Sequence, residues 1–190
     1  MTQADSVDAA FAAHPRTGFL PAHLQAEADY DGPLPIGCGQ TSSQPRTVAA
    51  MLRLLGVAPG MRVLDVGAGS GWTTALLAHL VGPTGAVHGV ELEPELVRFG
   101  AANLAATGQP WASIVAAEPG VLGLPALAPF DRILVSAEPD TLPQALVDQL
   151  GAGGVMVIPV AGVMQRVCRG EQPDDIQVTT HGGYSFVPLR

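Results

Sequence analysis

The sequence predicts an α/β fold, built on a mostly parallel sheet with helices on both faces. Short β-type runs alternate with helical segments through the middle of the chain, and one of these runs is followed at once by a glycine-rich turn. Strands that alternate with helices pair in parallel through right-handed crossovers, which places helices on both faces of an open sheet. Ligands of such sheets bind beyond the carboxyl ends of the strands.

The order of the elements follows from hydrophobic spacing and from Gly and Pro stop signals. Apolar residues at helical spacing predict a helix at 46–56, which Gly56 and Pro59 end. Further helices are expected at 72–81, 95–106 and 142–150, and strands at 61–66, 86–90, 111–116, 130–135 and 154–160. We expect residues 163–168 and 184–187 to form a closing pair of strands that includes an antiparallel member.

The composition disfavours several classes of function. The 190-residue chain has a formal net charge of -8, so its average field repels phosphate backbones, and nucleic acids are not expected as partners. No apolar run approaches the roughly 18–20 residues that cross a bilayer, so no membrane association is expected. The start of the chain lacks a secretion signal and the two cysteines suggest no disulfide framework, which predicts a cytoplasmic protein. His and Cys residues lack metal-ligand spacing, so no metal site is expected.

The glycine-rich turn is the first candidate binding element. Residues 65–71 read Asp-Val-Gly-Ala-Gly-Ser-Gly and lie between an expected strand and an expected helix. Gly67, Gly69 and Gly71 permit a sharp turn and let a ligand approach the backbone N–H groups at the start of the helix. The pattern alone is weak, because many α/β turns use glycine only for packing.

Two acidic residues follow the turn at strand ends. Glu91 lies 24 residues after Gly67, where its carboxylate can accept hydrogen bonds from both hydroxyls of a ribose. The alternative is a solvated residue at the end of a strand. Glu118, beyond the third strand, is a candidate acceptor for an adenine amino group, or else an exposed loop acid.

Two details separate the nucleoside ligands that such a turn can bind. The dinucleotide fingerprint needs a third glycine where this chain has Trp72. Asp65 favours a cationic ligand over a pyrophosphate, because an anion would meet like charge. S-adenosylmethionine carries a sulfonium and an ammonium and has no phosphate. The turn therefore favours an S-adenosylmethionine-dependent methyltransferase over a dinucleotide-dependent dehydrogenase.

A second motif precedes the turn. Residues 34–45 read LPIGCGQTSSQP, which resembles the loop before the cofactor domain of protein-L-isoaspartate O-methyltransferases. The likeness continues through 62–71, 128–133, 153–160 and 186–189, and so covers nearly the whole chain. The first string is specific, whereas 62–71 is shared by many methyltransferases. The resemblance implies the Rossmann-like class I methyltransferase fold.

The resemblance also implies an activity. Family members transfer a methyl group from S-adenosyl-L-methionine to the α-carboxylate of L-isoaspartyl or D-aspartyl residues in damaged proteins, leave S-adenosyl-L-homocysteine, and so begin repair. The implied partners are proteins or peptides with isoaspartyl residues. We expect a monomer with one domain over 1–190, in which 1–45 form a helical and loop segment on the substrate side and 46–190 the cofactor-binding core.

The family roles map onto matching positions of this chain. Ser43 is expected as the active-site hydroxyl with Thr41 beside it, and residues 40–43 as a loop that closes over cofactor and substrate. The expected cofactor contacts are Gln40, Thr41, Ser42, Ser43, Asp65, Gly67, Ala68, Gly69, Ser70, Gly71, Glu91, Leu92 and Glu118. A carboxylate substrate is ionised at neutral pH and needs no general base, so Ser43 is expected to position it. Ser43 is also close enough to Pro45 to serve as a helix N-cap, and both roles can coexist.

Some positions depart from the family pattern. Ser42 replaces a branched apolar residue, Cys38 stands where an aromatic is common, and Glu138 places an acid near the substrate, where it could repel a carboxylate. Ser42 and Glu138 motivate the alternative of a methyltransferase for another small molecule or modified peptide. The chain ends at Arg190, where many relatives continue, which motivates a second alternative, a non-catalytic binding protein with the same fold.

Overall fold

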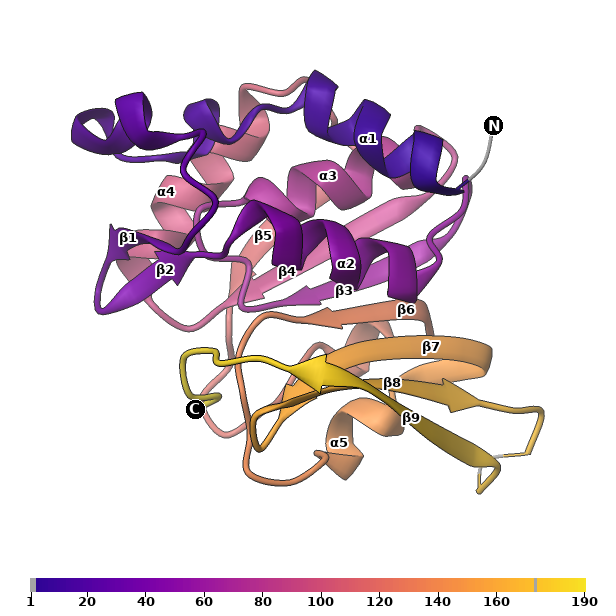
Figure 1. The fold of residues 1–190 in the computed structure, drawn as a ribbon. Coiled ribbons are helices and arrows are strands. Elements are labelled where there is room, and N and C mark those ends of the chain that lie inside the picture. The colour runs from indigo at the N-terminus through magenta and orange to yellow at the C-terminus, as the bar shows by residue number, and fades with distance from the viewer. Residues whose placement is uncertain (1–2, 173) are drawn as a thin grey trace.

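The computed structural model describes residues 3–172 and 174–190 and confirms the predicted α/β fold. In this part of the chain the main sheet has seven strands in the order β5-β4-β3-β6-β7-β8-β9 (Figure 1). Neighbouring strands from β5 to β7 run parallel, whereas β8 and β9 are antiparallel. The strands are β3 Arg62–Val66, β4 Ala86–Glu91, β5 Ala112–Ala116, β6 Phe130–Val135, β7 Leu150–Val160, β8 Val163–Arg169 and β9 Ile176–Gly183.

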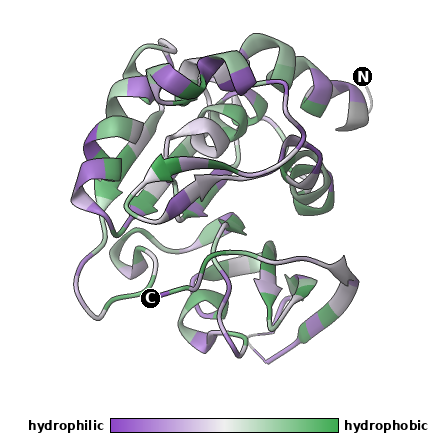
Figure 2. Ribbon diagram, turned by 60° about the vertical axis from the view of Figure 1, so that its left-hand side comes forward, coloured by the Kyte–Doolittle hydropathy of each residue, from purple (hydrophilic) through white to green (hydrophobic). Residues whose placement is uncertain are grey.

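Helices cover the two faces of the sheet unequally. The α-helices are α1 Gln3–Ala13, α2 Pro45–Leu55, α3 Trp72–Val81, α4 Pro94–Ala105 and α5 Gln144–Val147. Three short 3-10 helices are η1 Arg16–Phe19, η2 Ala22–Glu27 and η3 Pro125–Leu127. One core cluster joins α1, α2 and α3 to the sheet, and a second joins α5 to the opposite face. Figure 2 shows hydrophobic positions in the strands and mixed positions along the helices that cover them.

Most predicted elements are confirmed, and α3 and β6 have the predicted bounds. The helix predicted at 142–150 is shorter, because α5 spans Gln144–Val147 and Leu150 already begins β7. This early start of β7 includes a register shift opposite the segment between Phe130 and Arg132, and Gly153 lies there at a φ of 70°. An irregularity of this kind interrupts the alternation of apolar and polar residues, so the first part of β7 could not be predicted from hydrophobic spacing.

The strand predicted at 184–187 is wrong. The partner of β8 is β9, Ile176–Gly183, whereas 184–187 run on as an extended segment. β9 lies at the edge of the sheet, and most of its side chains are exposed. An exposed edge strand has little apolar alternation, so its sequence carries a weak strand signal.

A small hairpin lies outside the main sheet. Strands β1, Leu34–Gly37, and β2, Gln40–Ser42, pair antiparallel. Cys38 and Gly39 form the turn with φ angles of 52° and 70°. Cys38 is exposed in this turn, so an aromatic side chain at this position would have no core to fill.

Arg16 ties the N-terminal region to this hairpin. Its side chain is buried, and its Nε donates to Ser42 Oγ at 3.0 Å. Its Nη atoms donate to the backbone oxygens of Tyr30, Gly32 and Ser42 at 2.8–3.0 Å. The guanidinium also lies over the ring of Trp72, 5.6 Å from its centroid. One buried cation therefore holds β2 against η1 and the start of α3.

A second buried group connects β3 to α3. The carboxyl of Asp65 is fully buried, and its Oδ2 accepts hydrogen bonds from the hydroxyls of Thr73 and Thr74 at 2.8 and 2.7 Å. Its Oδ1 has no hydrogen-bond partner among the described residues. Burial raises the pKa of Asp65 to about 6, although the two threonine hydroxyls act in the opposite direction.

We predict that Arg16→Met destabilises the fold by about 2–4 kcal/mol, because it leaves buried carbonyl oxygens without a donor. Arg98→Met is the matched control, since Arg98 is exposed on α4. Urea unfolding of both variants measures the difference. Equal losses in the two variants would show that Arg16 does not hold the N-terminal region together.

Asp65 also predicts a pH dependence of stability. Its folded pKa lies above the unfolded value of about 3.9, so the folded state holds the proton more strongly between about pH 4 and pH 6. The penalty of the buried charge is therefore absent below about pH 4 and complete above about pH 6. We expect the stability of Asp65→Asn relative to the native chain to rise by about 2–3 kcal/mol between pH 4 and pH 7. Urea unfolding across this range tests it, and a constant difference would contradict it.

Candidate active site

A cavity lies at the carboxyl ends of β3, β4 and β6, where the strand order reverses. It has about 900 Å³ of space free of protein atoms, a figure that includes the open solvent at its mouth. We call it the inner cavity. The described residues that line it are Ile36, Gln40, Thr41, Ser42, Ser43, Val66, Gly67, Ala68, Gly69, Ser70, Trp72, Thr73, Val90, Glu91, Leu92, Ala117, Val121, Leu122, Gly123, Ser136, Ala137, Val187, Pro188, Leu189 and Arg190.

The glycine turn forms one wall and packs backbone to backbone against α4. Gly67, Gly69 and Gly71 have φ angles of 79°, 52° and 85°, in the left-handed region that favours glycine. A Cβ at Gly71 would lie 2.7 Å from the backbone oxygen of Gly100, and a Cβ at Gly100 would lie 2.6 Å from that of Gly69. The sequence argument missed Gly100. A glycine within the predicted helix at 95–106 was the signal that could have identified it, because glycine is unfavourable inside a helix unless close packing requires it.

Asn103 on α4 is a further residue that the sequence argument missed. Its Nδ2 donates to the backbone oxygen of Ser70 at 2.9 Å. This bond fixes the end of the turn one helical turn after Gly100. No local pattern distinguishes Asn103 from other polar helix residues.

The N–H groups of the turn are engaged by protein oxygens. Those of Gly67 and Ala68 donate to the backbone oxygen of Val90, and that of Gly69 donates to Glu91 Oε2 at 2.8 Å. The expectation that these three amides are bare is therefore wrong, because the end of β4 already supplies their acceptors. A turn with its amides occupied is a poor phosphate cradle, which agrees with a ligand that carries no phosphate.

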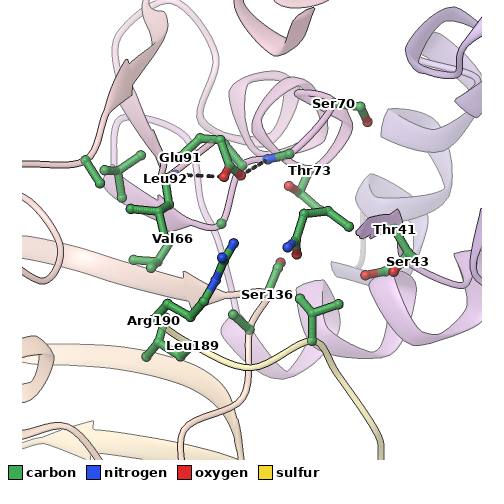
Figure 3. Close-up of a pocket in the computed structure, with 18 of the residues that line it drawn as sticks. Thr41, Ser43, Val66, Ser70, Thr73, Glu91, Leu92, Ser136, Leu189 and Arg190 are labelled. Carbon is green, nitrogen blue, oxygen red and sulfur yellow. Dashed lines mark hydrogen bonds between the residues drawn. The ribbon is translucent and has the colours of Figure 1, made fainter. Parts of the chain in front are cut away.

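Glu91 faces the inner cavity from the end of β4 (Figure 3). Its Oε1 accepts hydrogen bonds from the N–H groups of Leu92 and Glu93 at 2.7 and 2.9 Å, and its Oε2 accepts that of Gly69. A carboxylate has about four acceptor positions. Three backbone bonds hold this carboxylate in place and leave it capacity for a ligand hydroxyl.

Residues 40–43 line the cavity across from Glu91, although residues 40–42 form strand β2 where a loop was expected. Figure 3 shows Thr41 and Ser43 on the same side, with Ser136 nearby at the end of β6. Ser43 does not cap α2. The N-cap residue is Gln44, and the side-chain oxygen that accepts an N–H of the first turn belongs to Asp31, so that alternative role is wrong.

A second space, the outer groove, opens beside the inner cavity. Among the described residues, its walls are Pro33, Thr41, Ser43, Gln44, Arg46, Thr47, Ala50, Ser136, Gly183, Tyr184, Ser185, Phe186 and Val187. Thr41, Ser43, Ser136 and Val187 line both spaces, and we call the three hydroxyl residues among them the hydroxyl junction. A ligand in the cavity and a second one in the groove would meet there. The sequence argument missed Ser136, whose only signal was its position after a central strand.

Three predicted contacts do not line the inner cavity. Asp65 is buried behind the turn, where it binds Thr73 and Thr74, and Gly71 faces α4. Glu118 is exposed in the loop after β5, although the preceding residue Ala117 lines the cavity.

Glu138 holds the C-terminal segment. Its Oε1 accepts the N–H of Gly162 at 2.9 Å, and its Oε2 accepts the N–H of Phe186 at 3.2 Å. It lines neither the inner cavity nor the outer groove. The expectation that Glu138 repels a substrate carboxylate is therefore wrong, because both of its oxygens bind backbone.

Beyond this anchor the C-terminal segment reaches the inner cavity. Leu189 and Arg190 line it, and Figure 3 shows the Arg190 side chain directed into it from the side opposite Glu91. Arg190 Nη2 pairs with Glu93 Oε1 at 2.5 Å. Residues 187–190 thus form a wall of the cavity.

Within residues 3–172 and 174–190 the structure lacks two features. There, no three His, Cys, Asp or Glu side chains are grouped so that they could hold a metal ion. No helix there combines the length and the apolar character that crossing a membrane requires.

Known proteins resemble this chain in sequence and in structure. A protein-L-isoaspartate O-methyltransferase of Methanopyrus kandleri is 47% identical over 178 residues, which cover 92% of this chain and 79% of that protein. The same enzyme of Methanothrix thermoacetophila is 44% identical over 175 residues, with 92% and 83% covered. A beta-aspartate methyltransferase from Plasmodium falciparum, solved in complex with S-adenosyl-L-homocysteine, superposes with a TM-score of 0.85 at 26% identity and covers 98% of this chain and 90% of that one.

The family itself is defined by a sequence profile that spans the chain. The profile described as protein-L-isoaspartate(D-aspartate) O-methyltransferase matches residues 1–190. It confirms the resemblance first seen in residues 34–45, and the structural match confirms the class I methyltransferase fold. The glycine turn, Glu91 at the end of β4 and residues 40–43 gather around one cavity, and this chain belongs to the protein-L-isoaspartate(D-aspartate) O-methyltransferase family.

Proposed function

We infer that this protein transfers a methyl group from S-adenosyl-L-methionine to the carboxylate of L-isoaspartyl or D-aspartyl residues in damaged proteins, the first step of their repair. Family membership supports this reaction. The observation that carries it is the hydroxyl junction, where Thr41, Ser43 and Ser136 line both the inner cavity and the outer groove. Two spaces that meet at uncharged hydroxyls suit a methyl donor and a peptide acceptor.

The residues of the inner cavity fit S-adenosylmethionine. Glu91 is held for the ribose hydroxyls, and apolar side chains such as Leu92 and Leu122 offer a surface for the adenine. The turn at 67–70 would hold the methionine end. The N–H groups of Gly67, Ala68 and Gly69 in this turn already bond protein oxygens. The carboxylate of Glu91 beside them suits a ligand with net positive charge.

The reaction needs alignment more than acid–base chemistry. When bound, S-adenosylmethionine supplies an electrophilic methyl group on a sulfonium. An acceptor carboxyl group in water has a pKa of about 4 and is ionised at neutral pH, so no side chain must remove a proton. The hydroxyls of Thr41 and Ser43 would donate hydrogen bonds to it and orient one oxygen. Good alignment can supply roughly 7–11 kcal/mol of barrier reduction in favourable systems.

The structure gives no support to the two alternative functions. Ser42 faces Arg16 and Glu138 binds the C-terminal segment, so neither departure alters the groove as expected for another acceptor. The cavity is open and residues 187–190 form part of its wall, which does not favour a non-catalytic protein. We take the chain as one domain, since the β1–β2 hairpin and the elements packed on the seven-stranded sheet line the two spaces together.

The test of this function uses two peptides that differ only in an isoaspartyl or an aspartyl linkage. We expect tritiated methyl transfer to the isoaspartyl peptide and background labelling of its twin. Ser43→Ala should lower kcat/KM by about tenfold or more, because one oriented hydrogen bond to the charged acceptor is lost. Equal or absent labelling of the two peptides would refute the assignment.

The role of Glu91 is tested separately by binding. We predict that Glu91→Gln weakens S-adenosylhomocysteine binding by roughly 10- to 100-fold, since hydrogen bonds to a charged group are lost. Titration calorimetry measures the affinity. Glu95→Gln is the matched control, because Glu95 is exposed in the first turn of α4 and lines neither space. A similar loss in both variants would rule out a direct contact from Glu91.

A further inference from the structure

The outer groove carries one charged side chain. Among the described residues that line it, Arg46 is the only charged one, and the others are apolar, hydroxyl or amide residues or glycine. The chain as a whole has a formal net charge of -8 and only nine Lys and Arg. A cation in the groove is therefore not a consequence of the average composition.

Asp31 holds one edge of this arginine. Its Oδ1 accepts the backbone N–H of Arg46 at 3.1 Å, and its Oδ2 lies 3.5 Å from Arg46 Nε. The Arg46 side chain is nevertheless 78% exposed. In the part of the chain that the structure describes, no hydrogen bond involves its Nη1 or Nη2. These two nitrogens form the fork that matches a carboxylate.

Stability does not account for an arginine at this position. Arg46 lies in the first turn of α2, where the helix dipole disfavours a positive charge. Its exposed pair with Asp31 stabilises the fold little. A neutral or acidic residue would suit the helix better, which leaves a role in the groove.

Arg46 is also separated from the reacting carboxylate. It lines the outer groove but not the inner cavity, whereas Thr41, Ser43 and Ser136 line both. The carboxylate that receives the methyl group belongs at the hydroxyl junction. A second carboxylate on the same peptide would therefore be the group within reach of Arg46.

We propose that Arg46 is a specificity-determining residue that selects isoaspartyl peptides with an acidic side chain close to the isoaspartyl residue. The guanidinium binds this second carboxylate through Nη1 and Nη2 while Asp31 holds Nε. This proposal rests on the proposed function. The substrates that the protein prefers would then carry a negative charge beside the damaged residue.

The experiment compares isoaspartyl peptides in which one flanking residue is Glu, Gln or Lys, placed one or two positions before or after the isoaspartyl residue. Exposed charge pairs are weak, so the native protein should prefer at least one Glu peptide to its Gln twin by about two- to fivefold in kcat/KM. The preference should be lost in Arg46→Gln and retained in Arg46→Lys. Arg46→Glu should prefer Lys to Glu at the same position.

Two controls separate a local effect from a general one. Arg53→Gln removes the same charge from an exposed ion pair on α2 that is not part of the groove, and it should keep the native preference. Added salt near 1 M shortens the screening length to about 3 Å and should reduce the preference of the native protein.

The outcomes distinguish this proposal from the proposed function. If the native protein methylates Glu and Gln peptides equally at every position, or if Arg46→Gln and Arg53→Gln change the ratio alike, the role of Arg46 is overturned and the methyltransferase activity stands. If the native protein methylates none of the isoaspartyl peptides, the proposed function itself fails.

Discussion

The Glu91 carboxylate is the group on which the cofactor site depends. It binds the N–H of Gly69 in the glycine turn and those of Leu92 and Glu93 at the start of α4. The same helix touches the turn through Gly100, where any larger residue would collide with backbone. The Glu91 carboxylate and the absence of a side chain at Gly100 therefore fix the distance between the ends of β3 and β4, which enclose the cavity. The turn keeps its shape through protein contacts alone.

The sequence was informative wherever the signal is local. A strand, a glycine turn and a helix follow each other directly, so β3, α3 and the acid after β4 could be predicted from spacing, and residues 34–45 from their resemblance. Contacts between segments that are distant in the chain could not be predicted from the sequence. Glu138 is 48 residues from Phe186 in the chain, and nothing near either residue indicates that one carboxylate binds the other's backbone. β9 was missed because its exposed side chains lack an apolar pattern.

Charge is distributed so that each space has its own character. The inner cavity is lined by one acid, Glu91, and by one cation, Arg190, whereas the outer groove has an exposed arginine and no acid among the described residues that line it. The groove therefore favours an anionic acceptor, while the inner cavity offers a cationic donor the Glu91 carboxylate. The reacting atoms need no charged side chain between them, because the two ligands bring opposite charges themselves.

The bond between Arg16 and Ser42 has a consequence for how the chain can change during evolution. A branched apolar residue at position 42, as the family commonly has, would take one acceptor from a buried cation unless Arg16 also changed. The two positions lie 26 residues apart and are joined by two hydrogen bonds, of which only the one to the hydroxyl depends on the side chain at position 42. A change at either position alone therefore carries this cost, which a matched change at both positions can avoid.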